Sequence, residues 1–276
     1  MKYFVISLLL GLFIQANAQK TKKPYKQLQG FHHPESVVFD EQQKVYYVSN
    51  MAGKEEQDGF ISKVSENGEI LDTIWAKGLQ DPKGLLLHGD KLFVTDISFL
   101  VEIDPASGDI ISKTEVENAK SLNDIAADQE GNIYISDLVG NIIYKRDVSG
   151  NISEWLNTQE LERPNGLLVS EDKIFVASWG KDEPGHLLQV DRKSKEIKKI
   201  SPKGIGNLDG IQKIAPDSFY VSDWATGDIY RINTNGRMEK VLRSEKSSGD
   251  ILFLKGTEEL VLPMNHQNAI WWYRLN

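Results

Sequence analysis

The sequence predicts an all-β fold, a six-bladed β-propeller closed by an N-terminal strand, and three observations support this prediction. Six segments of one layout recur along the chain, beginning at Pro34, Pro82, Leu122, Pro164, Leu208 and Ser248. Their second residues lie 40 to 48 positions apart, the spacing of propeller blades that have four short strands each. Turn residues separate strand-length apolar runs, and helical periodicity is nearly absent apart from a short turn at 158–161.

The second segment shows how one blade is built. The stretch "GLLLHGDKLFVTD" reads as a buried strand, a turn at Gly89-Asp90 and a second strand. The stretch "LVEIDPASGDIISKTEV" adds a third strand, a turn at 104–108 and a fourth strand. Similar turns recur at 66–68, 149–151 and 233–236. No linker divides the repeats, so residues 19–276 are predicted to form one propeller domain.

The two ends of the chain are predicted to share a blade. Only three strands follow Ser248, and residues 24–30 precede the first complete segment. These residues are therefore expected to supply the outer strand of the last blade, which would leave no open sheet edge between the chain ends.

Residues 1–18 have the layout of a secretory signal peptide. Lys2 is followed by an apolar run from Tyr3 to Ile14 and by the small-x-small site Ala16-Asn17-Ala18. A membrane anchor is the alternative, but the run is shorter than the roughly 20 residues that span a bilayer. We therefore expect an exported protein, periplasmic or secreted, that is not inserted in a membrane once the signal is removed.

The charge of the chain indicates which kinds of molecule it binds. The formal net charge is −8, and the sequence has no basic cluster, which argues against nucleic acids and anionic membranes. The chain has no cysteine, so a sizeable core rather than disulfides should stabilise it. A small-molecule substrate is the expected partner.

The innermost strand of each blade runs beside the central axis, so its first residues form a ring at one end of the channel. The predicted ring consists of Glu35, Lys83, Asn123, Asn165, Asp209 and Gly249. The second strand returns to the same end, so the loops after it should border the mouth. These loops are 50–59, 96–99, 137–141, 179–185, 224–226 and 264–267.

The ring favours a site for a divalent metal. Four of its six residues carry side-chain oxygens, the ligands that calcium and similar ions prefer. A bound ion polarises a carbonyl and acidifies its water, which suits the opening of an ester or lactone. The alternative is a solvated channel, because Asn and Asp are common in turns and Glu35 could pair with Lys83.

The segments "PESVVFD", "LNDIAADQEGNIYISD", "RPNGLLV" and "NLDGI" resemble blade starts of the gluconolactonase, regucalcin (senescence marker protein) and luciferin-regenerating-enzyme family. The resemblance covers essentially the whole mature chain. It implies that Glu35, Asn165 and Asp209 bind a divalent metal, most simply calcium. It also implies that Asn123 contacts water or substrate beside the metal, and that Asp209 is the candidate catalytic base.

The chain departs from this family at two positions. The sugar-lactone hydrolases commonly carry an arginine two residues before the first asparagine, where this chain has Ser121. Lys83 adds a cation to the ring and is expected to contact the substrate together with Ser121. The resemblance therefore implies a lactone or cyclic-ester hydrolase whose substrate differs from the usual sugar lactones. A non-catalytic binding propeller and a lyase remain alternatives, since one fold hosts many functions.

Other mouth residues have simpler interpretations. Trp179 and Trp224 come directly after second strands, where they either pack between blades or contact a ligand. His266, on the last mouth loop, is a further candidate for substrate binding. The aspartates of "VTD", "ISD" and "VSD" are expected to bind backbone amides of nearby loops rather than to act in catalysis.

Overall fold

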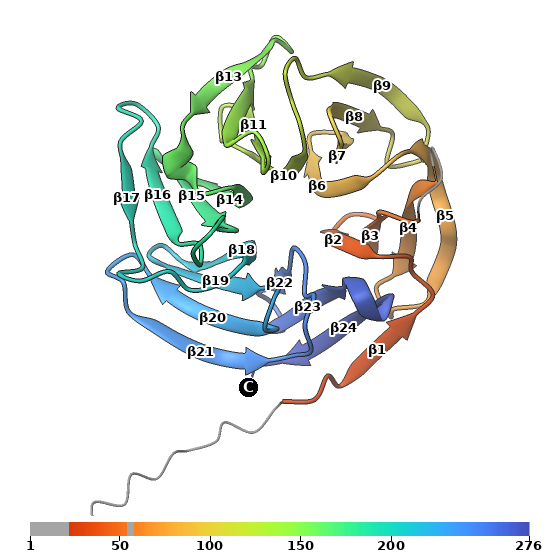
Figure 1. Cartoon of the computed structure of the whole chain (residues 1–276). Coiled ribbons are helices and arrows are strands. Elements are labelled where there is room, and N and C mark those ends of the chain that lie inside the picture. The colour runs from red at the N-terminus through yellow and green to blue at the C-terminus, as the bar shows by residue number, and fades with distance from the viewer. Residues whose placement is uncertain (1–21, 54–57, 276) are drawn as a thin grey trace, which may run out of the picture.

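The computed structural model describes residues 22–53 and 58–275. Its strands form six four-stranded sheets around a central axis, which confirms the predicted six-bladed propeller (Figure 1). The predicted signal peptide and the start of the mature chain lie outside the described residues. No helix in the described part of the chain is long and apolar enough to cross a membrane.

Within each of the first five blades, strands follow one another outward from the axis in chain order. Blade 1 comprises β2 (Pro34–Asp40), β3 (Val45–Asn50), β4 (Gly59–Ser65) and β5 (Ile70–Leu79). Blade 2 comprises β6 (Pro82–His88), β7 (Lys91–Asp96), β8 (Phe99–Ile103) and β9 (Ile110–Glu115). Blade 3 comprises β10 (Leu122–Ala127), β11 (Ile133–Asp137), β12 (Ile142–Arg146) and β13 (Ile152–Asn157).

The remaining blades continue the pattern. Blade 4 comprises β14 (Pro164–Ser170), β15 (Lys173–Ser178), β16 (Leu187–Asp191) and β17 (Ile197–Lys199). Blade 5 comprises β18 (Leu208–Ala215), β19 (Ser218–Asp223), β20 (Asp228–Asn233) and β21 (Met238–Arg243). Blade 6 comprises β22 (Leu252–Leu254), β23 (Glu259–Met264), β24 (Ala269–Arg274) and β1 (Lys26–Gln29).

The N-terminal strand β1 is the outermost strand of blade 6. It pairs antiparallel with β24, in a register that runs from Lys26 opposite Trp272 to Gln29 opposite Ala269. Leu28 packs against the core cluster that contains Trp272. The first and last described strands of the chain thus share one sheet, as Figure 1 shows at the meeting of the red and blue ends.

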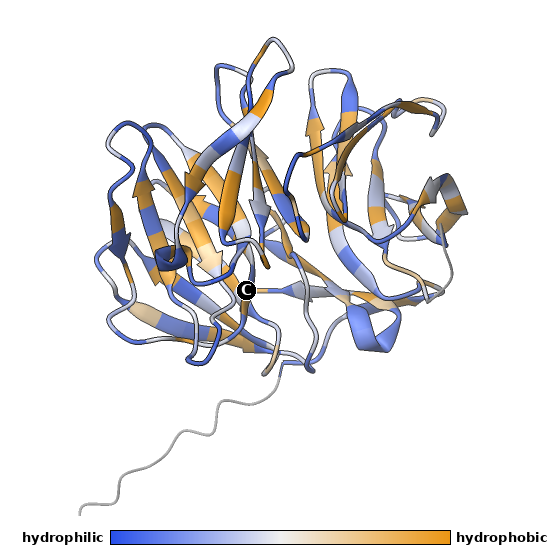
Figure 2. Ribbon diagram, turned by 45° about the horizontal axis from the view of Figure 1, so that its top comes forward, coloured by the Kyte–Doolittle hydropathy of each residue, from blue (hydrophilic) through white to orange (hydrophobic). Residues whose placement is uncertain are grey.

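Apolar side chains on the inner strands form the core. One buried cluster joins Tyr47 and Ile61 of blade 1 to Leu85 and Val94 of blade 2, so neighbouring sheets stabilise each other face to face. Outer strands such as β9 are mostly exposed. Figure 2 shows hydrophobic residues concentrated on the strands and hydrophilic ones in the connecting loops.

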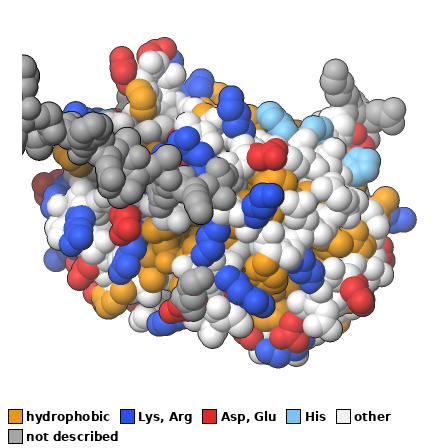
Figure 3. Space-filling model, turned by 90° about the horizontal axis from the view of Figure 1, so that it is seen from below, with side chains coloured by type: hydrophobic (Ala, Val, Ile, Leu, Met, Phe, Trp, Pro, Cys, Tyr) orange, Lys and Arg blue, Asp and Glu red, His pale blue; other side chains and the backbone are white. Residues whose placement is uncertain are grey.

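Helical structure is limited to two short 3₁₀ turns among the described residues, η1 (Gln159–Leu161) and η2 (Asn265–Gln267). The side chain of Thr158 accepts a hydrogen bond from the amide of Glu160 and caps η1. The turn predicted at 158–161 is therefore confirmed. On the face shown in Figure 3, Lys and Arg side chains lie scattered among hydrophobic and acidic ones.

A β-bulge lies at the start of the innermost strand in each of the first five blades. In blade 1, Pro34 pairs with Asn50 while Val37 pairs with Val48, so β2 has one extra residue. The same shift follows the first residue of β6, β10, β14 and β18. A bulge re-aims the side chains within it, and the ring residues of these five blades all lie there.

Candidate functional site

The structure places the predicted ring residues at equivalent positions of the six blades. Glu35, Asn123, Asn165 and Asp209 are buried at the starts of β2, β10, β14 and β18. Lys83 is the second residue of β6, and Gly249 lies three residues before β22. The bulges explain why polar side chains occupy these positions, since they turn consecutive residues away from the regular alternation of the strand.

Close contact between neighbouring blades sets the spacing of the ring. A Cβ atom on Gly166 would lie 2.1 Å from the carbonyl oxygen of Asp209, and one on Gly84 would lie 2.5 Å from that of Asn123. Only glycine permits these approaches. The backbones of Asp209 and Asn123 therefore rest against the innermost strand of the preceding blade.

In blades 2, 3 and 5, a hydroxyl group on the second strand joins the innermost strand to that of the next blade. Thr95, Ser136 and Ser222 accept hydrogen bonds from the amides of Gly84, Asp124 and Gly210 in their own blades. The same hydroxyls donate to the carbonyl oxygens of ring residues Asn123, Asn165 and Gly249 in the next blade. The sequence analysis missed these residues, although Ser or Thr is the penultimate residue of four second strands.

The aspartates at the ends of second strands bind backbone amides, as predicted. Asp137 accepts hydrogen bonds from the amides of Lys120 and Ser121, at 2.7 and 3.0 Å. Asp96 and Asp223 make the equivalent bonds in blades 2 and 5. These carboxylates hold the loop that leads into each ring residue.

Four carboxyl groups gather along the innermost strands. Burial raises the pKa of Glu35 to about 7 and the pKa of Asp124 to about 7. Burial, followed by the charges of Glu35 and Asp124, raises the pKa of Asp209 well above its usual value. The pKa of Asp250 is raised by burial and by the charges of the other three. Clustered carboxyl groups with such shifts are typical of functional sites.

Asp124 and Asp250 were not predicted from the sequence. Each directly follows a ring position: Asp124 lies in the bulge of β10, and Asp250 lies ahead of β22, where it pairs with Ser36 of blade 1. Asp124 accepts hydrogen bonds from the amides of Ile125 and Leu167, at 2.6 and 2.5 Å, so it joins blades 3 and 4. Ser36 Oγ lies 2.7 Å from Glu35 Oε2 and 3.4 Å from Asp250 Oδ2, which connects blades 1 and 6.

Two ring oxygens are buried without a hydrogen-bond partner among the described residues, Asn165 Oδ1 and Asp209 Oδ1. Leaving such an atom unsatisfied costs about 1–3 kcal/mol, so its position calls for a ligand. The amide of Asn165 hydrogen-bonds Asp209 and lowers its pKa, against the larger effect of burial. Two unpaired oxygens beside the Glu35 carboxylate are a donor set that fits a hard divalent cation.

The fit of this ligand set to a metal ion depends on Asn165. Among residues 22–53 and 58–275, no group of three or more His, Cys, Asp or Glu side chains is arranged to hold a metal ion. The predicted ligands are two carboxylates and one amide, so the third ligand would be the side-chain oxygen of Asn165. Metal binding by Glu35, Asn165 and Asp209 therefore stays a prediction, supported by the unpaired oxygens.

Lys83 and Ser121, both predicted to contact substrate, lie together. Lys83 Nζ is 3.4 Å from Ser121 Oγ and 3.5 Å from Asp81 Oδ2. The positive charge of Lys83 also lowers the pKa of Glu35 and of Asp209, although burial outweighs it in both. The cation thus acts on the carboxyl cluster from the side of blade 2.

Trp179, Trp224 and His266 also lie together, on the side of blades 4 to 6. The ring centroids of Trp179 and Trp224 are 5.5 Å apart, and those of Trp224 and His266 are 4.9 Å apart. Both tryptophans are partly exposed, and His266 is exposed. The tryptophans therefore pack against each other across two blades and still present surface to a ligand.

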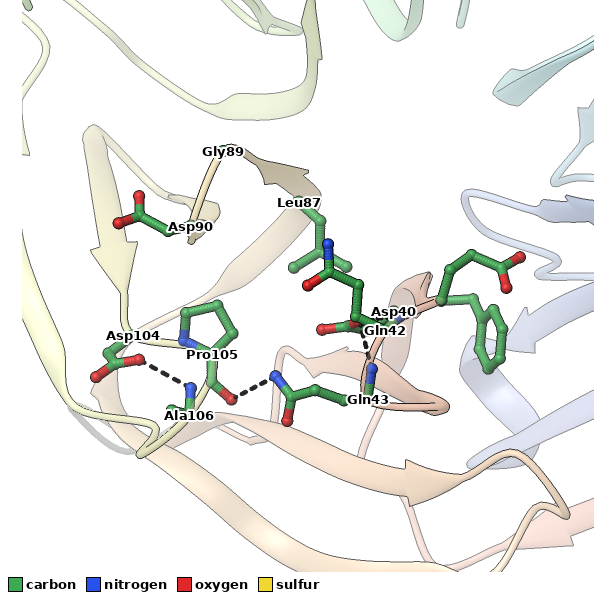
Figure 4. Close-up of a pocket in the computed structure, with 11 residues that line it drawn as sticks. Asp40, Gln42, Gln43, Leu87, Gly89, Asp90, Asp104, Pro105 and Ala106 are labelled. Atoms are coloured by element: carbon green, nitrogen blue, oxygen red, sulfur yellow. Dashed lines mark hydrogen bonds between the residues drawn. The ribbon is translucent and has the colours of Figure 1, made fainter.

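A cavity of about 470 Å³ lies between turns of blades 1 and 2, at the end of the strands opposite the ring. Figure 4 shows Asp40, Asp90 and Asp104 around it. Asp40 accepts hydrogen bonds from the amides of Gln42 and Gln43, and Asp104 accepts one from Ala106. Two of these carboxylates thus stabilise turns, so the ring is the better candidate for chemistry.

The pKa shifts predict how pH changes stability when metal is removed. Because the folded pKa values of Glu35 and Asp124 are raised to about 7, the folded protein binds protons more tightly than the unfolded chain. Stability present at lower pH is then lost as pH rises through about 7. With a chelator, we expect a melting temperature a few degrees higher at about pH 5.5 than at about pH 8. Equal melting temperatures would contradict the raised pKa values of Glu35 and Asp124.

No protein-family model matches the chain. No curated protein matches its sequence either. Solved structures resemble it, among them a gluconolactonase from Xanthomonas campestris, with a TM-score of 0.69 and 14% identity over 89% of this chain and 88% of that one. Virginiamycin B lyase from Staphylococcus aureus has a TM-score of 0.66 and 16% identity, over 90% of this chain and 87% of that one. The structure of a catalytically inactive variant of that lyase with quinupristin has a TM-score of 0.61 and 15% identity, over 90% of this chain and 97% of that one. At these identities the likeness shows the propeller fold, in which gluconolactonases are among the structural neighbours of this chain.

Proposed function

We propose that this protein is an exported hydrolase that opens a lactone or related cyclic ester with a divalent metal, calcium being expected, at the mouth of the channel. The observation that carries the proposal is the presence of two buried oxygens without a partner among the described residues, Asn165 Oδ1 and Asp209 Oδ1, near the carboxyl group of Glu35, whose charge raises the pKa of Asp209. A carboxyl cluster of this kind is unfavourable unless a cation or a proton neutralises it.

Each ring residue has a role in this proposal. Glu35, Asn165 and Asp209 would hold the ion, which when bound polarises the substrate carbonyl and acidifies water. The Asn123 amide orients the water or the substrate beside them. Asp209 takes up a proton from water, although a carboxylate next to a cation is a weak base.

In this proposal, Lys83 and Ser121 bind the substrate oxygen on which negative charge develops. The ammonium group of Lys83 donates hydrogen bonds and stabilises negative charge that develops on the substrate oxygen. Ser121 Oγ, 3.4 Å from Lys83 Nζ, supplies a second polar contact. A lysine is a flexible point charge, so the pair cannot reproduce the forked geometry of an arginine.

Metal analysis followed by a substrate panel tests the proposal. Purified protein should contain metal in stoichiometric amount and hydrolyse at least one member of a panel of lactones and cyclic esters, and chelation should abolish turnover. Ligand binding without turnover by the metal-loaded protein would instead support a non-catalytic propeller. Export is tested separately, because the exported chain should begin at Gln19.

A lyase is the second candidate, favoured by the likeness to virginiamycin B lyase. Raised carboxyl pKa values would also suit a base that removes a proton from carbon. Turnover in isotopically labelled water distinguishes the two reactions. Hydrolysis places labelled oxygen in the product acid, whereas elimination does not.

Replacement of Lys83 should separate substrate use from metal binding. In Lys83→Ala we expect turnover of the best substrate to fall on the order of tenfold or more, while metal affinity stays equal or rises because a nearby positive charge is gone. Gluconolactone should be a poor substrate of the natural protein. Steady-state kinetics and calorimetry measure these effects.

Lys63→Ala is the matched control, since Lys63 bonds Gln43 at the other end of blade 1. Its kinetics should equal those of the natural protein. Robust gluconolactone hydrolysis that survives Lys83→Ala would show that Lys83 does not govern specificity.

A further inference from the structure

The residue that directly follows the second strand is apolar in five of the six blades. These residues, here called the apolar collar, are Met51, Ile97, Leu138, Trp179 and Trp224. All five are partly exposed, whereas the last residue of each preceding strand is buried. Single exposed apolar residues are ordinary on protein surfaces. Five at one repeated position around one mouth form a recurring feature that calls for an explanation.

One backbone hydrogen bond recurs in the collar and places it next to the ring. The amides of Leu138, Trp179 and Trp224 donate to the carbonyl oxygens of residues 121, 163 and 207, at 3.0, 2.9 and 2.9 Å. Met51 makes the equivalent bond to residue 33, at 3.3 Å. Each acceptor lies two residues before a ring residue, so the collar residues of blades 1, 3, 4 and 5 lie at one level, beside the backbone that leads into the ring.

The aromatic part of the collar is continuous across blades. Trp179 and Trp224 contact each other, and Trp224 contacts His266. In blade 6 the equivalent residue, Asn265, is buried, and the exposed His266 follows it. Blades 4 to 6 therefore present one aromatic wall to the mouth, opposite the side on which Lys83 and Ser121 lie.

The collar and the ring would select different parts of one substrate. The buried ring offers carboxylate and amide groups to a polar reacting bond. At the collar, the binding free energy becomes more favourable by roughly 25 cal/mol for each Å² of apolar surface that a ligand covers. The hydroxyl groups of a polyhydroxylated ring would lose their hydrogen bonds to water there, because the side chains of Met51, Ile97 and Leu138 offer no hydrogen bonds in exchange.

We infer that the substrate is an ester or lactone that carries an aromatic or alkyl group beside the reacting carbonyl, and that this group binds to the apolar collar, with Trp179 and Trp224 as its main contacts. The reacting bond in this inference rests on the proposed function. The preference for an apolar group rests on the collar alone, so binding of a stable analogue tests it without turnover.

Two lactams that resist hydrolysis are suitable probes: the lactam analogue of dihydrocoumarin, which has an aromatic ring, and gluconolactam, which has hydroxyl groups instead. Calorimetry with the metal-loaded protein should show tighter binding of the aromatic lactam. Trp179→Ala and Trp224→Ala should each weaken its binding about tenfold, and Trp224→Phe should retain most of the affinity. Trp155→Ala is the matched control, because Trp155 makes a similar aromatic contact, with Tyr134, on an outer strand.

Should the alanine variants fail to fold, Leu138→Asn tests the same collar with a smaller change, and weaker binding of the aromatic lactam is again expected. Equal affinity for the two lactams, or unchanged affinity in both tryptophan variants, would overturn the inference. Preferential binding of the aromatic lactam by a protein that turns over no ester would support the inference while contradicting the proposed hydrolase.

Discussion

Glu35→Gln and Asp209→Asn should each weaken calcium binding on the order of 100-fold or more and abolish metal-dependent turnover. Each change removes one negative charge from the ring and keeps the shape of the side chain, so the loss falls on the cation rather than on core packing. Both side chains are buried, at 7% and 4% exposure, which limits screening of the lost charge by water. Calorimetric titration and kinetics measure the two effects.

The metal-free variants should melt at least as high as the metal-free natural protein at about pH 8, because each removes a buried carboxyl group whose raised pKa destabilises the fold there. Asp90→Asn, in a turn at the opposite end of the propeller, is the matched control and should leave calcium affinity unchanged. Unchanged affinity in Glu35→Gln and Asp209→Asn would instead favour the solvated channel.

Deletion of residues 19–30 should destabilise the whole propeller, although none of them belongs to the candidate site. The deletion removes β1 and its pairing with β24, and it uncovers the core cluster that Leu28 packs against. We expect a loss on the order of 3 kcal/mol from hydrogen bonding and apolar burial, which corresponds to roughly 10 °C in melting temperature.

A shorter deletion, of residues 19–23, leaves β1 intact and is the matched control. It should melt close to the full mature chain. If both deletions melt at the temperature of the mature chain, the N-terminal strand does not contribute to stability as its pairing implies.

The two tests address different levels of the structure. The ring variants alter charge inside a fold that stays closed, whereas the deletion alters the outer edge of blade 6 and leaves every ring residue in place. A melting temperature lowered only by the deletion, together with metal affinity lowered only by the ring variants, would show that the site and the outer strand are energetically separable.

Features that depend on local order along the chain could be read from the sequence. The recurring strand and turn residues determined the number of blades, because strand alternation and turn chemistry act over a few neighbouring residues. They also located the starts of the innermost strands, and hence Glu35, Asn123, Asn165 and Asp209. The binding of backbone amides by Asp96, Asp137 and Asp223 followed from the same local chemistry.

Features that depend on neighbouring blades required the tertiary structure. Asp124 lies in the bulge of β10, and only the register between strands reveals a bulge. Asp250 joins the cluster because blade 6 meets blade 1, where Asp250 pairs with Ser36. The hydroxyl of Ser136 accepts a hydrogen bond from the amide of Asp124 and donates one to Asn165, 29 residues further along the chain than Ser136. The collar could have been noticed as an apolar residue after each second strand, but its continuity depends on contacts such as that between Trp179 and Trp224. The sequence by itself thus determined the blades and most of the ring, because those follow from short-range propensity. The tertiary structure decided the charge cluster and the collar, because burial and the mutual approach of distant side chains arise only when six sheets close around one axis.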